Sequence, residues 1–355
     1  MIMKTSSAVY DYPTDESVVL LFSVGFCNRA KKEGENTMKK LLAFLLAALM
    51  IFSLTACGGT KELRFVTGGE SGTYYAFGTV IAQHATNNIG VKVNALVGAG
   101  SKGNVNKLAD KEAELALCQS DVMAYAYDGT NLFEKEGKVT NFSVLGALYI
   151  ETVQLVAVNP DIKSVTDLKG KSVSVGAAGS GVYFNALDVL AAYDMKLEDI
   201  NPTYQSFGDS ANDLKDGKID AAFIVAGAPT TAVVDLAATN KNTHLVTFDE
   251  AHLNKLLASS PYYTKSVIKG GTYSTVAEDV VTVGVGAVLL VRDDISEDVV
   301  YKLTKDIFEN PSALVGSHAK YGEVSVEYGA SMTSVPYHKG AAKFFQEKGV
   351  TVKTK

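Results

Sequence analysis

A short pattern of apolar strand, Gly/Ser-rich turn and aromatic helix start occurs twice in this chain. The first copy covers residues 66–75 (VTGGESGTYY), and the second covers residues 175–184 (VGAAGSGVYF). A second pair of similar segments lies at residues 108–117 and 214–223. A duplicated βα pattern, with one copy in each half of the chain, predicts two similar lobes. Each lobe would direct the backbone N–H groups of a helix start at a shared ligand.

The first part of the chain has the features of a bacterial secretory signal. Two lysines follow Met38, an apolar run covers residues 41–54, and small residues precede Cys57. The run is short for a membrane span, and residues 54–57 resemble a lipobox, which implies cleavage before Cys57 and a lipid on its sulfur. An ordinary N-terminal anchor is the alternative. We expect an exported chain that is lipid-anchored at Cys57 to the outer face of the cytoplasmic membrane.

Composition narrows the choice of partners. The chain has 33 Lys and Arg residues against 39 Asp and Glu residues, which gives a net charge of −6. No run of basic residues follows the signal, and this argues against nucleic acid as a partner and against an electrostatic hold on anionic lipid. Cys118 lies in an apolar segment and is expected to be a small core residue.

Apolar segments and turns alternate as in an α/β protein. In the first half we expect strands at 61–67, 91–97 and 115–119, with helices at 73–87 and after the turn at 98–103. In the second half we expect a helix at 183–193, a strand at 202–207, a helix at 210–216 and a strand at 221–225. Such alternation favours a mostly parallel sheet covered by helices.

Two long apolar segments, residues 145–158 and 280–291, are expected to carry the chain from one lobe to the other and back. The predicted fold class is therefore α/β: crossing strands join two α/β lobes, and the ligand cleft lies between them. Open α/β sheets bind ligands at the carboxyl ends of their strands, where both Gly/Ser turns are found.

The expected division of the chain follows from these features. Residues 1–37 would be a wrongly assigned start or a disordered extension, 38–56 the lipoprotein signal peptide, 57–62 the linker after the anchor, 63–150 the first lobe, 151–278 the second lobe, and 279–355 the return strand and C-terminal helices that complete the first lobe.

Motifs of other functions are weak or missing. Gly98, Gly100 and Gly103 fit the G-x-G-x-x-G dinucleotide pattern, but the helix that follows is short and an exported chain has little access to nicotinamide cofactors. A tight turn on the rim of the cleft is the favoured interpretation. No G-x-S-x-G, HExxH or CxxC motif occurs, so we expect no enzyme activity, no metal and no cofactor.

Arginine is scarce after the signal, where only Arg64 and Arg292 occur. A carboxylate ligand is normally gripped by a bidentate arginine. An anion would here depend on helix N-termini and on the hydroxyls of Ser71, Thr73 and Ser180. Ser71 and Ser180 could also serve only as helix N-caps.

Several segments together resemble the TAXI family, the extracytoplasmic solute receptors of tripartite ATP-independent periplasmic (TRAP) transporters. The segments are residues 67–78, 148–151, 167–176, 179–181, 214–229 and 279–291, and the resemblance covers nearly all of 61–350. Two positions depart from the family pattern. Ile150 stands where the family usually has proline, and Gly284 or Gly286 replaces a proline of the return strand.

The resemblance implies a two-lobed, type II-like periplasmic binding protein fold. The ligand that it implies is a small carboxylate or amino acid, such as glutamate or glutamine, captured by hinge closure. It also implies TRAP membrane subunits, driven by an ion gradient, as partners. The ligand-binding residues that it implies are Ser71, Gly72, Thr73, Tyr74, Gln119, Asp121, Tyr149, Ser180, Gly181, Val182, Gly227 and Pro229.

Three alternatives stay open at the level of sequence. The chain could be a receptor for an ABC importer or a sensor kinase, with the same fold and cleft. It could be a surface immunogenic or adhesive lipoprotein without a transport role. It could also be an extracellular enzyme, although the motifs that such an enzyme needs are missing.

Overall fold

The computed structural model describes residues 62–309 and 311–355. The first lobe opens with elements that alternate strand and helix. In chain order they are β1 (Leu63–Val66), α3 (Thr73–Asn88), β2 (Val93–Leu96), α4 (Ser101–Ala109), β3 (Leu115–Gln119), α5 (Ser120–Asp128) and the 3₁₀ turn η1 (Asn131–Phe133). The helix α3 illustrates the local logic, because Phe77, Ile81 and Ala85 recur every four residues and form its buried face. The predictions for Cys57 and for residues 1–61 lie outside the described residues.

The second lobe follows a long strand, β4 (Phe142–Ala157). Its elements are η2 (Val165–Leu168), β5 (Ser172–Ser174), α6 (Val182–Ala192), η3 (Leu197–Asp199), β6 (Asn201–Thr203), α7 (Phe207–Lys215), β7 (Ala221–Ala226), α8 (Thr231–Thr239), β8 (His244–Leu245), α9 (Glu250–Ser259) and β9 (Thr264–Ile268). The strand predicted at 202–207 is therefore shorter than expected. Ser206 caps the next helix by accepting a hydrogen bond from the Asp209 N–H, and this cap begins α7 at Phe207.

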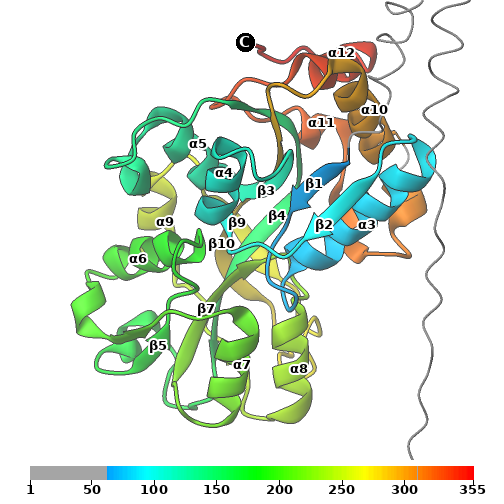
Figure 1. The fold of residues 1–355 in the computed structure, drawn as a ribbon. Coiled ribbons are helices and arrows are strands. Elements are labelled where there is room, and N and C mark those ends of the chain that lie inside the picture. The colour runs from blue at the N-terminus through cyan, green and yellow to red at the C-terminus, as the bar shows by residue number, and fades with distance from the viewer. Residues whose placement is uncertain (1–61, 310) are drawn as a thin grey trace, which may run out of the picture. The chain divides into compact units, whose positions relative to one another are not determined.

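A second long strand, β10 (Val280–Arg292), returns to the first lobe. The C-terminal elements are α10 (Glu297–Phe308), η4 (Pro311–Leu314), η5 (Ala319–Glu323), α11 (Val326–Gly329) and α12 (Lys339–Glu347). Figure 1 shows β4 and β10 between the group formed by α3 and α10–α12 and the group formed by α6–α8. No helix in the described part of the chain is long and apolar enough to cross a membrane.

One 10-stranded sheet runs through both lobes in the order β2-β1-β3-β10-β4-β7-β5-β6, with β8 beside β4 and β9 beside β10. The two long strands are antiparallel to each other from Gly284 opposite Thr152 to Arg292 opposite Phe142. The first-lobe part of β10 also pairs with β3, and its second-lobe part pairs with β9. The pairing of β10 with β4 shifts register after Ala287 and again after Leu289. These irregularities lie in the part of β10 that pairs with β3 of the first lobe.

The apolar cores follow the same division. One buried cluster lies in the first lobe and includes Phe65, Phe77 and Leu117. The second lobe has a cluster on each face of its sheet: Phe223 belongs to one and Ile224 to the other. Successive residues of β7 are thus buried on opposite faces, which explains why that strand is apolar throughout.

Candidate functional site

A cavity of about 520 Å³ lies between the two lobes. The first lobe contributes residues 68–74 and 97–101, together with Gln119. The second lobe contributes residues 180–182 and 205–209, with Ala177, Asn212, Val225 and Ala226, and Glu151 lies on the crossing strand β4. Both copies of the duplicated Gly/Ser turn therefore meet in one cavity. A volume of this size suits a small molecule.

Four helices begin at this cavity, namely α3, α4, α6 and α7. The first three have glycine N-caps, Gly72, Gly100 and Gly181, and no described side chain makes a capping hydrogen bond there. Only α7 has a side-chain cap among these four, supplied by Ser206. No described side chain therefore caps the first-turn N–H groups of these three helices, although the Gly103 N–H of α4 donates to the Gly179 carbonyl. Each helix start carries a partial positive charge.

Glycine is required at these starts because the lobes approach each other closely. Gly100 has φ 101°, and a Cβ on it would lie 2.9 Å from the Cα of Ser180 in the other lobe. A Cβ on Gly181 would lie 1.5 Å from Oε1 of Gln119. Backbone of one lobe thus packs directly against backbone or side chain of the other.

Hydrogen bonds also join the lobes around the cavity. The Gly103 N–H donates to the Gly179 carbonyl at 3.3 Å, and the Ala232 N–H donates to the Ser71 carbonyl at 3.2 Å. The Thr73 hydroxyl donates to the carbonyl of Gly227 at 2.7 Å. These contacts cross the cleft, so the described conformation is closed.

A buried polar network extends this contact behind the cavity. The Asn185 side chain donates to Asp121 Oδ2 at 3.0 Å and to the Tyr263 hydroxyl at 2.8 Å, and it accepts from Gln119 Nε2 at 3.1 Å. Burial raises the pKa of Asp121 to about 6, while hydrogen bonds from Val122 N–H and Asn185 oppose the shift. The Tyr263 hydroxyl donates in turn to Asp188.

Among the described residues that line the cavity, the acidic ones are Glu70, Glu151 and Asp209, and no Lys or Arg is among them. Burial raises the pKa of Glu151 to about 8. Tyr74 lies beside this carboxyl group, but neither the Tyr74 hydroxyl nor Glu151 Oε1 has a partner in hydrogen-bond geometry within the described chain. The side chains of Gln119 and Ser180 also present a buried oxygen without such a partner.

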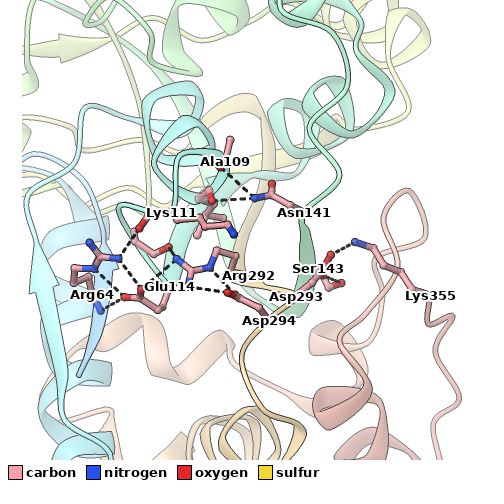
Figure 2. A network of polar contacts seen from close by, with 12 residues as sticks. Arg64, Ala109, Lys111, Glu114, Asn141, Ser143, Arg292, Asp293, Asp294 and Lys355 are labelled. Carbon is pink, nitrogen blue, oxygen red and sulfur yellow. Dashed lines mark hydrogen bonds and ion pairs between the residues drawn. The ribbon is translucent and has the colours of Figure 1, made fainter. Parts of the chain in front are cut away.

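Neither arginine of the described chain reaches the cavity, because both bind Glu114 (Figure 2). Arg64 donates to the two carboxylate oxygens of Glu114 at 3.0 and 2.7 Å. Arg292 donates to Glu114 Oε1 at 3.2 Å and pairs with Asp294. Burial alone would raise the pKa of Glu114, but the two arginines hold it below its ordinary value. The arginines therefore link β1 to β10 through Glu114. They do not contribute positive charge to the cavity lining, where the helix starts lie.

The structure brings together most of the residues predicted for the ligand site. Those that line the cavity are Ser71, Gly72, Thr73, Tyr74, Gln119, Ser180, Gly181 and Val182. Among the predicted residues that the structure describes, Asp121, Tyr149, Gly227 and Pro229 are outside the lining. Asp121 is held by Asn185, and Tyr149 is buried beneath the cavity with its ring against Phe77 and Lys320.

Sequence reasoning missed two parts of the wall: Glu151 and the start of α7. The sequence carried a signal for the second, because Ser206 followed by Asp209 is a helix-start pattern. The turn at 98–101, expected on the rim of the cleft, lies in the cavity lining. Among the described residues, no cluster of three or more His, Cys, Asp or Glu side chains could hold a metal ion.

Solved structures share this architecture. A structure from Bordetella bronchiseptica RB50 has a TM-score of 0.50 at 15% identity, over 80% of this chain and 88% of that chain. PhnD1 from Prochlorococcus marinus, in complex with methylphosphonate, has a TM-score of 0.49 at 11% identity, over 75% and 89% of the two chains. The alkanesulfonate-binding protein SsuA from Xanthomonas axonopodis pv. citri, bound to MOPS, has a TM-score of 0.44 at 15% identity, over 81% and 90%.

Identities this low speak only to the fold. The likeness to the Bordetella structure and the strand order agree with the predicted two-lobed α/β arrangement, and the periplasmic binding protein fold expected from the sequence is confirmed.

A family model, described as the NMT1-like family, matches residues 65–349. This match corrects the family expected from the sequence motifs: the resemblance to the TAXI family was wrong, and the TRAP membrane subunits that it implied as partners lose their support. The matched segment includes both Gly/Ser turns, both crossing strands and every residue that lines the cavity. The chain belongs to the NMT1-like family.

Proposed function

We propose that this protein is an extracytoplasmic solute receptor, which binds one small molecule between its lobes and delivers it to an importer of the ABC type. The observation that carries the proposal is the cavity of about 520 Å³, which has walls from both lobes. Three helix starts without side-chain caps among the described residues open into it. Such a cavity can bind a molecule without carrying out chemistry on it, so the protein acts as a receptor and not as an enzyme.

The mechanism that we propose is hinge closure about β4 and β10. A ligand that touches both lobes stabilises the closed form by the difference between its contacts in the closed and open forms. The hydrogen bonds from Thr73 to Gly227 and from Ala232 to Ser71 exist only when the lobes meet. The closed surface would then be what the membrane partner recognises.

The proposed ligand is a small carboxylate or an amino acid. Helix N-termini bind anions through free N–H groups and the helix dipole. The Ser180 hydroxyl lies at one of these helix starts and has no partner within the described residues, whereas the Thr73 hydroxyl donates its proton to the Gly227 carbonyl. The arginines are held at Glu114, so the helix starts are the source of positive potential in the cavity.

Calorimetry with a panel of amino acids and small carboxylates tests the receptor function. At least one member should bind with a dissociation constant in the micromolar range or below, which corresponds to about −8 kcal/mol or stronger. A panel that produces neither heat nor thermal stabilisation would contradict a solute receptor of this class. The Ser180→Tyr variant, which should block the cavity, is the control for ligand binding at another site.

The membrane partner that we propose is an ATP-driven importer, the alternative to TRAP subunits considered from the sequence. Cells that depend on this protein for uptake should stop importing the ligand when ATP is depleted. Uptake should continue when the sodium gradient is collapsed. The opposite pattern would contradict an ABC-type partner while leaving the receptor function intact.

We also propose that the mature protein begins at Cys57 and is anchored there by a lipid, as residues 54–57 suggest. Replacement of Cys57 by alanine should move the protein from the membrane fraction to the soluble exported fraction. A Cys57→Ala protein that stays with the membrane would contradict the lipid anchor and favour an uncleaved N-terminal anchor.

A further inference from the structure

Glu151 is a buried carboxylate in the wall of the cavity. It lies on β4 opposite Val285 of β10, where the chain passes between the lobes, and it is only 2% exposed. Gln119 Nε2 lies 3.5 Å from Glu151 Oε2, which is the limit of a hydrogen bond. Glu151 Oε1 has no partner in hydrogen-bond geometry among the described residues. Burial raises the pKa of this carboxyl group, and the Tyr74 hydroxyl that lies beside it lowers the pKa by a smaller amount. A carboxylate buried with so little compensation is costly unless another group completes its contacts.

The basic side chain that acts on Glu151, that of Lys320, already has an acidic partner. Lys320 acts electrostatically on Glu151, but its ammonium group forms an ion pair with Glu323 at 2.5 Å. The same ammonium group lies 5.8 Å from the centre of the Tyr149 ring, and Lys320 is outside the cavity lining. The protein therefore supplies no direct cationic partner for Glu151 within the described chain.

Other polar atoms without partners surround the same space. Gln119 and Ser180, which are 2% and 6% exposed, each have a buried oxygen that makes no hydrogen bond within residues 62–309 and 311–355. The Tyr74 hydroxyl also lacks a partner in hydrogen-bond geometry there, and it lies beside Glu151. Native proteins rarely leave buried polar atoms unsatisfied, and several around one cavity indicate that a ligand completes them. All of these residues line the cavity.

The cavity thus has two electrostatic poles. The helix starts at Gly72, Gly100 and Gly181 favour an anionic group. The acidic side chains of the lining disfavour a second anion and favour a cation. A ligand with a carboxylate alone would satisfy the first pole and leave Glu151 without a partner.

We propose that Glu151 is the specificity-determining residue of the cavity, and that it receives a protonated nitrogen of the ligand while the helix starts receive the ligand's anionic group. The solute is then an amine-bearing acid and not a simple carboxylate. This inference rests on the proposed receptor function and narrows its ligand class. A charge-assisted contact to Glu151 also explains why a carboxylate is kept in a strand whose residues are nearly all buried.

Matched pairs of ligands test the proposal on the unmodified protein. L-glutamate with glutarate, L-leucine with 4-methylpentanoate, and L-phenylalanine with 3-phenylpropanoate differ within each pair only by the α-ammonium group. Calorimetry should show binding of at least one amino acid, with roughly 10- to 100-fold weaker binding of its deaminated partner. Equal or tighter binding of the deaminated acid would overturn the proposal.

The Glu151→Gln variant separates an ionic contact from a neutral one. If Glu151 pairs with an ammonium group, the variant should bind the amino acid roughly 10- to 100-fold more weakly. If a protonated Glu151 instead donates to a ligand oxygen, glutamine can replace it and the affinity stays unchanged, which would refute the proposal. Glu112→Gln, at an exposed glutamate outside the lining, is the matched control and should bind like the unmodified protein.

The identity of a co-purified molecule tests the role of Glu151 separately from the receptor function. A bound solute without a basic nitrogen would refute the role of Glu151 and leave the receptor function standing. A protein that binds no small molecule at all would refute the receptor function itself.

Discussion

Asn185 donates a hydrogen bond of 3.0 Å to Asp121 Oδ2 and so joins the second lobe to the first. Asn185 is fully buried on α6, and Asp121 is 2% exposed in the first turn of α5. The same asparagine contacts Gln119, which lines the cavity. This one side chain therefore connects the lobe contact to the wall of the ligand site, and closure and ligand binding are expected to respond together when it is changed.

Removal of this link should weaken closure. The Asn185→Ala variant leaves Asp121 without its partner from the other lobe, and an unsatisfied buried charge or polar group costs about 1–3 kcal/mol. We expect a lower melting temperature and weaker binding of any ligand identified by calorimetry. Asn242→Ala, at an exposed position, serves as the control. Unchanged affinity in Asn185→Ala would show that the network does not contribute to closure.

The two buried carboxyl groups predict an unusual dependence of stability on pH. Burial raises the pKa of Asp121 to about 6 and that of Glu151 to about 8, above the ordinary values of 3.8 and 4.5. A group that binds its proton more tightly in the folded chain makes folding more favourable as the pH falls through the folded pKa. Their contribution to stability should therefore increase from above pH 8 down to about pH 5, before other carboxylates begin to protonate.

Thermal unfolding between pH 8.5 and pH 5 measures this dependence. The melting temperature of the ligand-free protein should rise as the pH falls, and the rise should be smaller in a variant that carries both Asp121→Asn and Glu151→Gln. The single Glu151→Gln variant is measured beside the double variant. It keeps the other groups that act on Glu151 from neighbouring elements, which are Tyr74, Asp121, Lys320 and Tyr328. The same slope in the double variant and the unmodified protein would exclude these two carboxyl groups as its source.

A methyl group at Gly181 tests the close approach of the lobes. A Cβ there would lie 1.5 Å from Gln119 Oε1, so Gln119 must move and break its contact with Asn185. Gly181→Ala should reduce ligand affinity with little loss of fold stability, because the clash involves the end of a side chain. Gly316→Ala, where nothing lies within 4 Å of the added atom, should behave like the unmodified protein. Equal affinities of the two variants would argue against this closed packing.

The arginine cluster in Figure 2 is expected to serve stability and not binding. Its carboxylate, on Glu114, has a side chain 10% exposed, and Arg292 is 11% exposed. Glu114→Gln removes the carboxylate that the two arginines share, while Arg292 keeps Asp294, and it should lower the free energy of unfolding by roughly 1–3 kcal/mol. Urea unfolding measures this change, and calorimetry on the folded variant should show unchanged ligand affinity. Weakened binding with unchanged stability would instead place the cluster in the ligand site.

A large side chain at Ser180 should block the cavity. Ser180 is 6% exposed, lines the cavity, and lies against Gly100 of the other lobe. Ser180→Tyr should abolish the thermal stabilisation that the ligand gives to the unmodified protein. Ser317→Tyr, at an exposed position, should retain it. A normal ligand shift in Ser180→Tyr would remove this cavity as the binding site.

The fold could be predicted from sequence because its signals are local and repeated. The Gly/Ser turns, the helix starts after them and the two long apolar segments each have a distinct pattern, and their order determines which lobe they enter. The strand predicted at 202–207 extends too far, because Tyr204 and Phe207 were treated as strand residues, whereas β6 ends at Thr203. The N-cap at Ser206 outweighs their β-propensity and starts a helix.

The site could be predicted less completely because cavity walls come from distant segments. Ser180 and Gly181 were found since their turn repeats that of Ser71 and Gly72. Glu151 was missed as a wall residue, because the sequence of β4 around it does not show that this position faces the cavity. Asp121 was expected to contact the ligand, and only the packing of α6 against α5 shows that Asn185 holds it.

Native mass spectrometry of the purified protein tests the central claim most directly. The unmodified protein, as purified or after incubation with the panel of amino acids and carboxylates, should carry one small molecule per chain. The Ser180→Tyr variant prepared in parallel should carry none. The absence of any bound molecule from the unmodified protein, or the same bound molecule in both proteins, would contradict a receptor that holds its solute between the two Gly/Ser turns.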